Sequence, residues 1–339
     1  KGRGPIFRKD VRNFVEEVKH AVPRALQSEE FQTKRDALIK TADERRNRIL
    51  TDLGEEAQRS GFSIQATPVG VVLIPVVNGK PVSEEELDNL PEHVKKEIVD
   101  RKENLQSKFE QSVKQLSSLD RDTRVALRKL TSDTVEYAIG FLADSLLKTY
   151  SDIPEIVNYL NDVRADILEN LELFTGSREA APTQGQMTAP WMKDLPLRRY
   201  EVNVIVDNSA LKGAPVVFEG NPTYSNLFGR IEKEALFGSF TTDFTLIKGG
   251  SLHRANGGYL VVRIQELLGN ALSYDGLKRA LRDSKIVIEE AAERLGFIST
   301  KTLTPQPIPL DVKVVLVGNP LLYQLLYAYD PEFTEFFKV

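Results

Sequence analysis

The apolar residues of this 339-residue chain follow two different spacings, and the change between them constrains the fold more than any single motif. From Arg8 to about Phe174 they recur at helical intervals between charged residues, the pattern of one apolar face on a long α-helix. Beyond that point, short apolar runs alternate with turns and helical stretches. The pattern predicts a helical region followed by an α/β region.

The helical region carries four apolar stripes. They are Phe31, Leu38, Ala42, Ile49, Leu53 and Ala57; Val94, Ile98, Leu105, Phe109, Val113 and Leu116; Leu127, Leu130, Tyr137 and Phe141; and Ile156, Leu160, Val163, Ile167 and Leu171. Asp120 stands between the second and third stripes and is predicted to cap a helix there. Stripes this narrow favour an antiparallel helical bundle or coiled coil over residues 1–175.

One stretch interrupts the helical spacing. In "GFSIQATPVGVVLIPVVNGKPVS" (Gly61 to Ser83), β-branched residues flank the turn signals Pro68-Val69-Gly70 and Asn78-Gly79. This stretch predicts a β-hairpin near residues 62–80, between long helices. Residues 176–197 are rich in Gly, Pro, Thr and Ala and have no period, so they are predicted to be a linker, with an ordered excursion as the alternative.

The α/β region spans residues 198–339. Its predicted strands are "YEVNVIVD" (200–207), "PVVFEG" (215–220), "GYLVVR" (258–263), "KIVIE" (285–289) and "VKVVLVG" (312–318). The last four are apolar at consecutive positions, which is typical of strands buried on both faces of a parallel sheet. "YDGLKRALRD" (Tyr274 to Asp283) is a predicted helix between two of them. A parallel sheet covered by helices is therefore expected.

Composition excludes several classes of protein. The chain has 45 Lys+Arg against 49 Asp+Glu, so its charge gives no reason to expect a nucleic-acid or membrane partner. It has no Cys, and its three His are far apart, so no metal site is expected. No apolar run is long enough to span a bilayer and no signal peptide opens the chain, so a cytoplasmic location is expected.

Two of the strands occur in an informative order. "ANGGYLVV" and a helix are followed by "VKVVLVGNP" and another helix, the order of the Walker B and sensor-1 strands in an AAA+ ATPase. Asn319 then stands where such an enzyme needs a polar group near the attacking water or the γ-phosphate. The alternative is that "GNP" only ends a strand. In this order, we favour a functional origin for Asn319.

Four longer stretches resemble the ATPase-like module of Lon-family proteases, in the branch with a long helical insertion. They are "PVVFEGNPTYSNLFGRIE", "TDFTLIKGGSLHRANGGYLVV", "GLKRALRDSKIVIE" and "TLTPQPIPLDVKVVLVGNPLLYQLLYAYDPEFTEFFKV". The resemblance covers Leu211 to Val339 strongly. It extends more weakly over Lys1 to Phe174, through "KGRG", the helical pattern and the hairpin.

The resemblance implies an α/β AAA+-like sheet with a helical arm, in a parent protein similar to ATP-dependent serine endopeptidases with a Ser-Lys dyad. It also implies a homohexameric ring, unfolded protein substrates, and ATP with Mg²⁺ in the parent. No catalytic residue and no bound cofactor are expected in this piece alone, which begins at Lys1 rather than Met.

The chain departs from the family pattern where nucleotide chemistry would be carried out. The family's P-loop would lie before Lys1, and Gly79-Lys80 does not form one. Behind the glycine pair Gly257-Gly258, Arg263 and Ile264 occupy the positions of the Mg²⁺-binding Asp and the water-polarising Glu. Gln265 or Glu266 would substitute only if the strand carried a bulge.

The arginine that an AAA+ neighbour contributes is also missing. Its place corresponds to "DPEFTEFFKV", which offers Thr334, Phe336 and Lys338. Lys338 supplies charge without the bidentate fork of an arginine. Both departures predict weak or lost hydrolysis.

A substrate-gripping loop is expected before the Walker B-like strand, with Phe237, Gly238 and Phe240 as its candidates; the alternative is that both phenylalanines are core residues. His253-Arg254 and Ser251 are predicted to have structural roles, with a phosphate or subunit contact as the alternative for the His-Arg pair.

Three functions follow in order of preference. The first is a ring module that captures or threads unfolded polypeptide toward a proteolytic chamber. The second is a non-hydrolysing pseudo-ATPase scaffold for oligomerisation and access control. The third is the ATPase of an enhancer-binding transcription activator, whose modules carry a similar "LFG…GSFT" loop; the near-neutral charge and the lack of a helix-turn-helix signal disfavour it.

Overall fold

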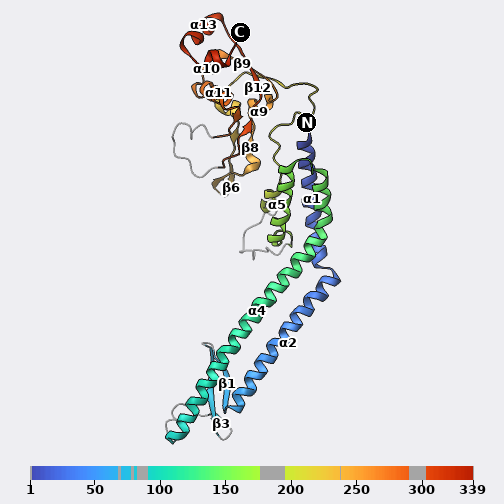
Figure 1. The fold of residues 1–339 in the computed structure, drawn as a ribbon, viewed down its shortest axis with the longest axis vertical. Coiled ribbons are helices and arrows are strands. Elements are labelled where there is room, and N and C mark those ends of the chain that lie inside the picture. The colour runs from blue at the N-terminus through green and yellow to red at the C-terminus, as the bar shows by residue number, and fades with distance from the viewer. Residues whose placement is uncertain are drawn as a thin grey trace. The chain divides into compact units, whose positions relative to one another are not determined.

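A computed structural model describes residues 2–67, 70–77, 80–81, 91–175, 195–236, 238–289 and 303–338 (Figure 1). The chain divides into two compact units, residues 17–179 and residues 1–16 with 180–339. We call the first the arm and the second the core. Helix α1 (Arg3–Leu26) belongs to both, because the division between the units falls within it.

The arm is built on two long helices, α2 (Glu29–Arg59) and α4 (Glu92–Thr149), which lie side by side (Figure 1). The Ser28 side chain begins α2 by accepting a hydrogen bond from the Phe31 N–H at 3.3 Å. Helix α5 (Pro154–Glu169) packs on α4, and the short α6 (Glu172–Thr175) follows it. These residues form helices because their apolar positions recur with the helical period.

Two of the sequence predictions for α4 are wrong. Asp120 is not a cap, because α4 runs through it without a break; its carboxylate pairs instead with Arg46 of α2. Tyr137 and Phe141 do not face the bundle, since they are 91% and 83% exposed. The buried residues of this part of α4, Val135, Ile139 and Ala143, lie on the opposite side of the helix.

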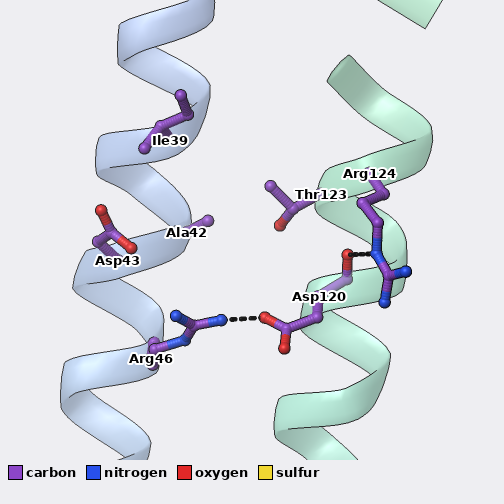
Figure 2. Close-up of a pocket in the computed structure, with 7 residues that line it drawn as sticks. All are labelled: Ile39, Ala42, Asp43, Arg46, Asp120, Thr123 and Arg124. Atoms are coloured by element: carbon purple, nitrogen blue, oxygen red, sulfur yellow. Dashed lines mark hydrogen bonds and ion pairs between the residues drawn. The ribbon is translucent and has the colours of Figure 1, made fainter. Parts of the chain in front are cut away.

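The two long helices are bridged across a cavity of about 350 Å³ (Figure 2). Its lining residues are Ile39, Ala42, Asp43, Arg46, Asp120, Thr123 and Arg124. The small side chains of Ala42 and Thr123 face one another here, and the ion pair between Arg46 and Asp120 closes one end (Figure 2). This part of the arm is therefore held more by polar contacts than by packing.

A small antiparallel sheet stands at the end of α2. Strand β1 (Phe62–Thr67) pairs with β2 (Gly70–Val77), where the sequence predicts a hairpin, and β2 pairs with β3 (Lys80–Pro81). Ala57 of α2, Phe62 of β1 and Leu105 of α4 are buried together, with Leu73 and Ile98 packed against them. We call these five residues the tip cluster.

The core contains a parallel three-stranded sheet. Its strands are β4 (Val216–Glu219), β9 (Gly258–Arg263) and β12 (Val312–Val317), in the order β12-β9-β4. Helices α8 (Tyr224–Phe228), α9 (Ser251–Ala255), α10 (Ile264–Leu268) and α11 (Ala271–Asp283) join with the strands in one buried apolar cluster. The predicted α/β fold with a parallel sheet is confirmed, and it is compatible with an AAA-like module.

The remaining elements of the core are short. They are η1 (Leu195–Tyr200), β5 (Arg230–Ile231), β6 (Glu234–Leu236), β7 (Ser239–Thr241), η2 (Phe244–Leu246), β8 (Ile247–Lys248), β10 (Lys285–Ile286), β11 (Ile308–Pro309), α13 (Pro320–Tyr329) and α14 (Phe333–Phe336).

The strand predicted at residues 200–207 is absent from the described structure. The Asn203 side chain instead donates hydrogen bonds to the carbonyls of Phe244 and Ile247, at 2.8 and 2.9 Å. These bonds hold the extended segment without a strand ladder. The strand predicted at 285–289 is shorter, because only Lys285 and Ile286 pair, with β11.

One face of the parallel sheet is exposed. Leu260 and Val262 point into the buried cluster, whereas Val216, Phe218 and Val317 are 69%, 58% and 48% exposed. The sequence predicts these strands to be buried on both faces, and for the described residues that prediction is wrong. Helix α13 has no fully buried residue, although Leu322 and Leu326 pack against the core cluster.

Candidate functional site

The carboxyl ends of the three parallel strands bring together residues that are far apart in the sequence. The register sets Val317 of β12 beside Arg263 of β9, and Val262 of β9 beside Glu219 of β4. Asn319 follows β12 by two residues, so Glu219, Arg263 and Asn319 lie along one edge of the sheet. In open α/β sheets this is the edge where ligands bind.

Arg263 is exposed at this edge and contacts an aromatic ring. Its guanidinium carbon lies 5.9 Å from the centroid of the Phe218 ring on the open face of the sheet. Such a cation–π contact contributes about 0.5–1 kcal/mol at an exposed site. A guanidinium has only donors and a fixed positive charge, so it cannot ligate Mg²⁺, which needs oxygen ligands.

Ile264 points the other way, into the core. It is 4% exposed and belongs to the buried cluster. Gly318 lies directly against it, since a Cβ at Gly318 would come within 2.3 Å of Ile264 Cγ2. The side chain at position 264 therefore fills the core beneath the edge and does not reach a water molecule above it.

The two polar residues after Ile264 do not lie within the strand. Strands β9 and β12 keep an unbroken register as far as Arg263, so no bulge shifts Gln265 or Glu266 into the strand. Glu266 belongs to α10 and has an exposed side chain. For the described residues, no group of three or more His, Cys, Asp or Glu is placed to hold a metal ion. The side chains at positions 263 and 264 themselves offer no oxygen ligand to magnesium.

Asn319 has a structural partner. Its Oδ1 accepts a hydrogen bond from the Leu322 N–H at 2.9 Å and caps the start of α13, with Pro320 as the first helical residue. This is the backbone role that the sequence alone allows. The side chain is nevertheless exposed at the edge beside Arg263, where a polar side chain can also meet a ligand.

The glycine pair lies at the opposite edge of the sheet. Gly257 has φ +79°, and a Cβ at Gly258 would lie 2.1 Å from the Pro215 carbonyl oxygen. The strand between them and Arg263 spans about 16–20 Å. Gly257 and Gly258 therefore lie apart from the other candidate residues, which are Arg263, Ile264, Glu266 and Asn319. Backbone geometry accounts for the presence of glycine at positions 257 and 258.

Glu219 is a site residue that the sequence analysis missed. Its carboxylate accepts hydrogen bonds from the Ser251 hydroxyl, from the Asn221 N–H at 3.0 Å and from Arg254 Nη2 at 3.4 Å. The Glu219 side chain is 12% exposed and Ser251 is fully buried. The only sequence signal was an acid at the end of an apolar strand. These bonds tie the end of β4 to α9.

His253 has the structural role that the sequence analysis favoured. Its Nδ1 accepts a hydrogen bond from the Gly250 N–H at 3.1 Å, and its Nε2 is buried with no hydrogen-bond partner among the described residues. Burial lowers the pKa of His253 to about 4. The imidazole is therefore neutral at pH 7 and fastens the start of α9.

The candidate gripping loop is a short hairpin. Strands β6 and β7 pair antiparallel, with Ala235 opposite Phe240. Phe240 is 80% exposed, and Gly238 adopts φ +78°, a conformation that favours glycine. Phe237 lies outside the described residues. Arg198 holds the base of this hairpin by pairing with Glu234 and Asp243.

Lys338 is exposed just after α14, and Thr334 is exposed within it. The turn that leads to α14 is fixed from α11: Tyr274 donates to Asp330 Oδ2 at 2.6 Å, and Lys278 Nζ lies 3.0 Å from Asp330 and 3.1 Å from Glu332. This network positions the segment in which a family member would carry its arginine.

Comparison with known proteins supports the resemblance seen in the sequence. Residues 212–339 match the family described as the LonB-like AAA domain. A Lon protease homolog of Escherichia coli (strain K12) is 31% identical over 113 residues, a match that covers 31% of this chain and 18% of that protein. The chain thus matches less than a fifth of that relative's length. No helix in the described ranges is both long and apolar enough to cross a membrane.

Proposed function

We propose that this chain, whose residues 212–339 match the LonB-like AAA domain, serves as a polypeptide-handling ring component without productive ATP hydrolysis. In this proposal the core assembles into a hexameric ring, and the arm captures unfolded polypeptide for a proteolytic chamber. One observation supports the loss of hydrolysis: the two positions that the resemblance aligns with the acids hold an exposed guanidinium and a buried isoleucine.

The electrostatics at the carboxyl edge support this loss. Phosphoryl transfer needs Mg²⁺ to neutralise the charge that develops on the phosphates, and a carboxylate to hold the metal. Arg263 repels the cation, and Ile264 leaves no oxygen to orient water. Lys338 offers a point charge where the bidentate fork of an arginine would be used. ATP with Mg²⁺ is therefore proposed to bind weakly, if other parts of the parent protein supply a phosphate cradle.

The exposed apolar side chains support polypeptide capture. Tyr137 and Phe141 are one helical turn apart on α4 and are almost fully exposed, and Phe240 is exposed on the β6–β7 hairpin. Soluble proteins seldom leave paired aromatic side chains open to water without a partner for them. An unfolded chain, whose apolar residues are also exposed, is a partner of matching chemistry.

The pseudo-ATPase scaffold is a second candidate. The same two residues, Arg263 and Ile264, favour it, because a module that cannot hydrolyse ATP can still assemble and restrict access. The two candidates differ in what the arm does: the first requires the arm to bind unfolded polypeptide, and the second does not.

Phosphate release by the intact protein tests the loss of hydrolysis. We expect no Mg²⁺-dependent turnover above the spontaneous rate, and no change with Arg263→Ala, because Ile264 still leaves the site without a base. Lys313→Ala, an exposed cation on neighbouring β12, is the matched control. Turnover that requires Mg²⁺ and falls in Arg263→Ala alone would show that the site is active.

Binding of fluorescently labelled, unfolded casein tests the arm. Replacing residues 34–166 by a short linker in the intact protein should weaken binding at least tenfold, which corresponds to about 1.4 kcal/mol. Thermal unfolding and sedimentation of the variant check that the core still folds and assembles. Unchanged affinity in a folded, assembled variant would remove the arm from polypeptide capture and leave the scaffold candidate.

A further inference from the structure

Among the described residues, strand β1 at the end of the arm has one edge without a neighbouring strand, which we call the open edge. In the order β1-β2-β3 it pairs with β2 alone among the described strands. The Val76 N–H donates to the Gly61 carbonyl at 2.7 Å, and Phe62 stands opposite Pro75, which has no N–H to donate. Alternate residues of an antiparallel strand direct both backbone groups to the same side. Phe62 and Ile64 therefore direct their N–H and C=O groups away from β2.

This edge lacks the protection that natural edge strands usually carry. Proteins guard open edges with charged side chains, proline or bulges, because unpaired backbone groups recruit another strand. The sequence of β1 is "FSIQAT", with no charged residue and no proline, and its register with β2 has no bulge. The outward N–H and C=O groups of this edge can therefore hydrogen-bond to the backbone of an added extended segment.

A cavity of about 590 Å³ lies beside the first half of this edge. It is lined by Gly54 and Gln58 of α2, by Gly61, Phe62, Ser63 and Ile64, and by Val76 of β2. Phe62 is 2% exposed and connects the cavity wall to the tip cluster, whereas Ile64 is 36% exposed at its rim. The two glycines leave room in this wall, and Phe62, Ile64 and Val76 give it an apolar part beside the polar Gln58 and Ser63. A large side chain of a client can pack against that apolar part.

We propose that the open edge of β1 and this cavity form the site where the arm captures unfolded polypeptide. An extended client segment adds to β1 as a further strand and hydrogen-bonds to the backbone of Phe62 and Ile64. One of its aliphatic or aromatic side chains enters the cavity. Backbone bonds bind many sequences alike, while the cavity selects segments with a large apolar residue. This inference rests on the capture role proposed above and names its site.

A second copy of this chain fits the edge poorly. Gly54 and Gln58 place α2 next to the cavity, so a copy added with the same face up would bring its own α2 alongside. Adjacent strands lie about 4.8 Å apart, whereas packed helices need about 8–10 Å between axes. A copy added with the opposite face up would direct Ser63, rather than an apolar side chain, into the cavity. An unfolded client has neither restriction.

Filling the cavity provides the sharpest test. Gly54→Leu adds a side chain within a helix at a position where a Cβ meets no atom within 4 Å, and Gly140→Leu makes the same change in α4 at an equally open position. In the intact protein, Gly54→Leu should weaken binding of labelled, unfolded casein at least tenfold. Gly140→Leu should stay within twofold of wild type. Equal affinity of Gly54→Leu and wild type would overturn the proposal.

The edge is tested separately from the cavity. Ile64→Pro removes an N–H that faces outward and is not used in the ladder, while Ile64→Val keeps it. We expect at least tenfold weaker casein binding for Ile64→Pro only, and slower amide exchange of residues 62–66 in wild type when casein is added. Unchanged exchange in wild type would overturn the proposal even if Ile64→Pro does not fold.

The outcomes also separate this site from the function on which it rests. If removal of residues 34–166 weakens casein binding but Gly54→Leu does not, the arm captures polypeptide elsewhere and this site is wrong. If neither change weakens binding, the capture role of the arm fails as well. If Ile64→Pro changes the sedimenting mass and leaves casein binding intact, the edge pairs copies of this chain and the proposal is overturned.

Discussion

The arm and the core reach stability by different means. In the core, helices and strands bury one apolar cluster that includes Leu227, Leu252, Leu260, Leu267 and Leu277, each fully buried. In the arm, α2 buries only Phe31, Leu53 and Ala57 along 31 residues. Its middle meets α4 through the polar cavity of Figure 2. A pair of long helices can thus be held together by contacts near its two ends while its middle remains weakly packed.

The comparison is tested most strongly by truncating one leucine in each unit. Leu260→Ala removes a fully buried side chain from the core and should lower the free energy of unfolding by about 2–5 kcal/mol. Leu50→Ala, at a position of α2 that is 48% exposed, should cost less than about 1 kcal/mol. Denaturant unfolding followed by circular dichroism measures both. Similar losses for the two variants would mean that the middle of the arm is packed as tightly as the core.

A smaller effect is expected from pH in the core. The folded-state pKa of His253 is about 4, below the unfolded value of about 6.5. The unfolded chain therefore binds the proton first as pH falls, and stability decreases below pH 6.5. Between pH 7 and pH 5 the loss should be about 2 kcal/mol.

Denaturant unfolding at the two pH values measures this loss. His253→Gln should remove most of the pH dependence, because glutamine does not titrate. His20→Gln, at an exposed position of α1, is the control and should retain it. A pH dependence that survives in His253→Gln would assign it to other groups.

The smallest effect is expected in the middle of the arm. The side chains of Arg46 and Asp120 are 46% and 43% exposed, so their ion pair is screened by water. A double-mutant cycle with Arg46→Ala and Asp120→Ala should give a coupling of about 0.2–1 kcal/mol that decreases with added salt. A coupling above about 2 kcal/mol, insensitive to salt, would show that this pair specifies the arm in the way that packing specifies the core.

Hydrophobic periodicity predicted the helices and strands well, but it predicted less well which side of each element is buried. The parallel sheet followed from runs such as "VKVVLVG", because consecutive apolar residues favour strands in an α/β fold. Tyr137 and Phe141 were assigned to the wrong face of α4, since apolar residues one turn apart form a stripe whether or not a partner covers it. Asp120 was read as a cap because its ion-pair partner, Arg46, lies on another helix.

For the candidate site too, the sequence places residues on their elements but does not give the contacts of their side chains. Arg263 and Ile264 were located correctly at the end of a strand by their spacing from the glycine pair. Their directions, over Phe218 and into the core, depend on contacts across strands that no local pattern contains. The sequence does not identify Glu219 as a site residue, because its hydrogen-bond partner Ser251 is distant in the sequence. Local patterns place a residue on an element, and tertiary packing decides what its side chain meets.

The burial of Ile264 has a consequence for any attempt to introduce acids at positions 263 and 264. Replacing Arg263 changes an exposed side chain, and the sheet would tolerate it. Introducing a carboxylate at 264 instead forces an unpaired charge against Gly318 in the apolar interior, at a cost of several kcal/mol. The two positions are therefore unequal: a single exchange suffices for an acid at position 263, whereas an acid at position 264 also requires changes in the surrounding core.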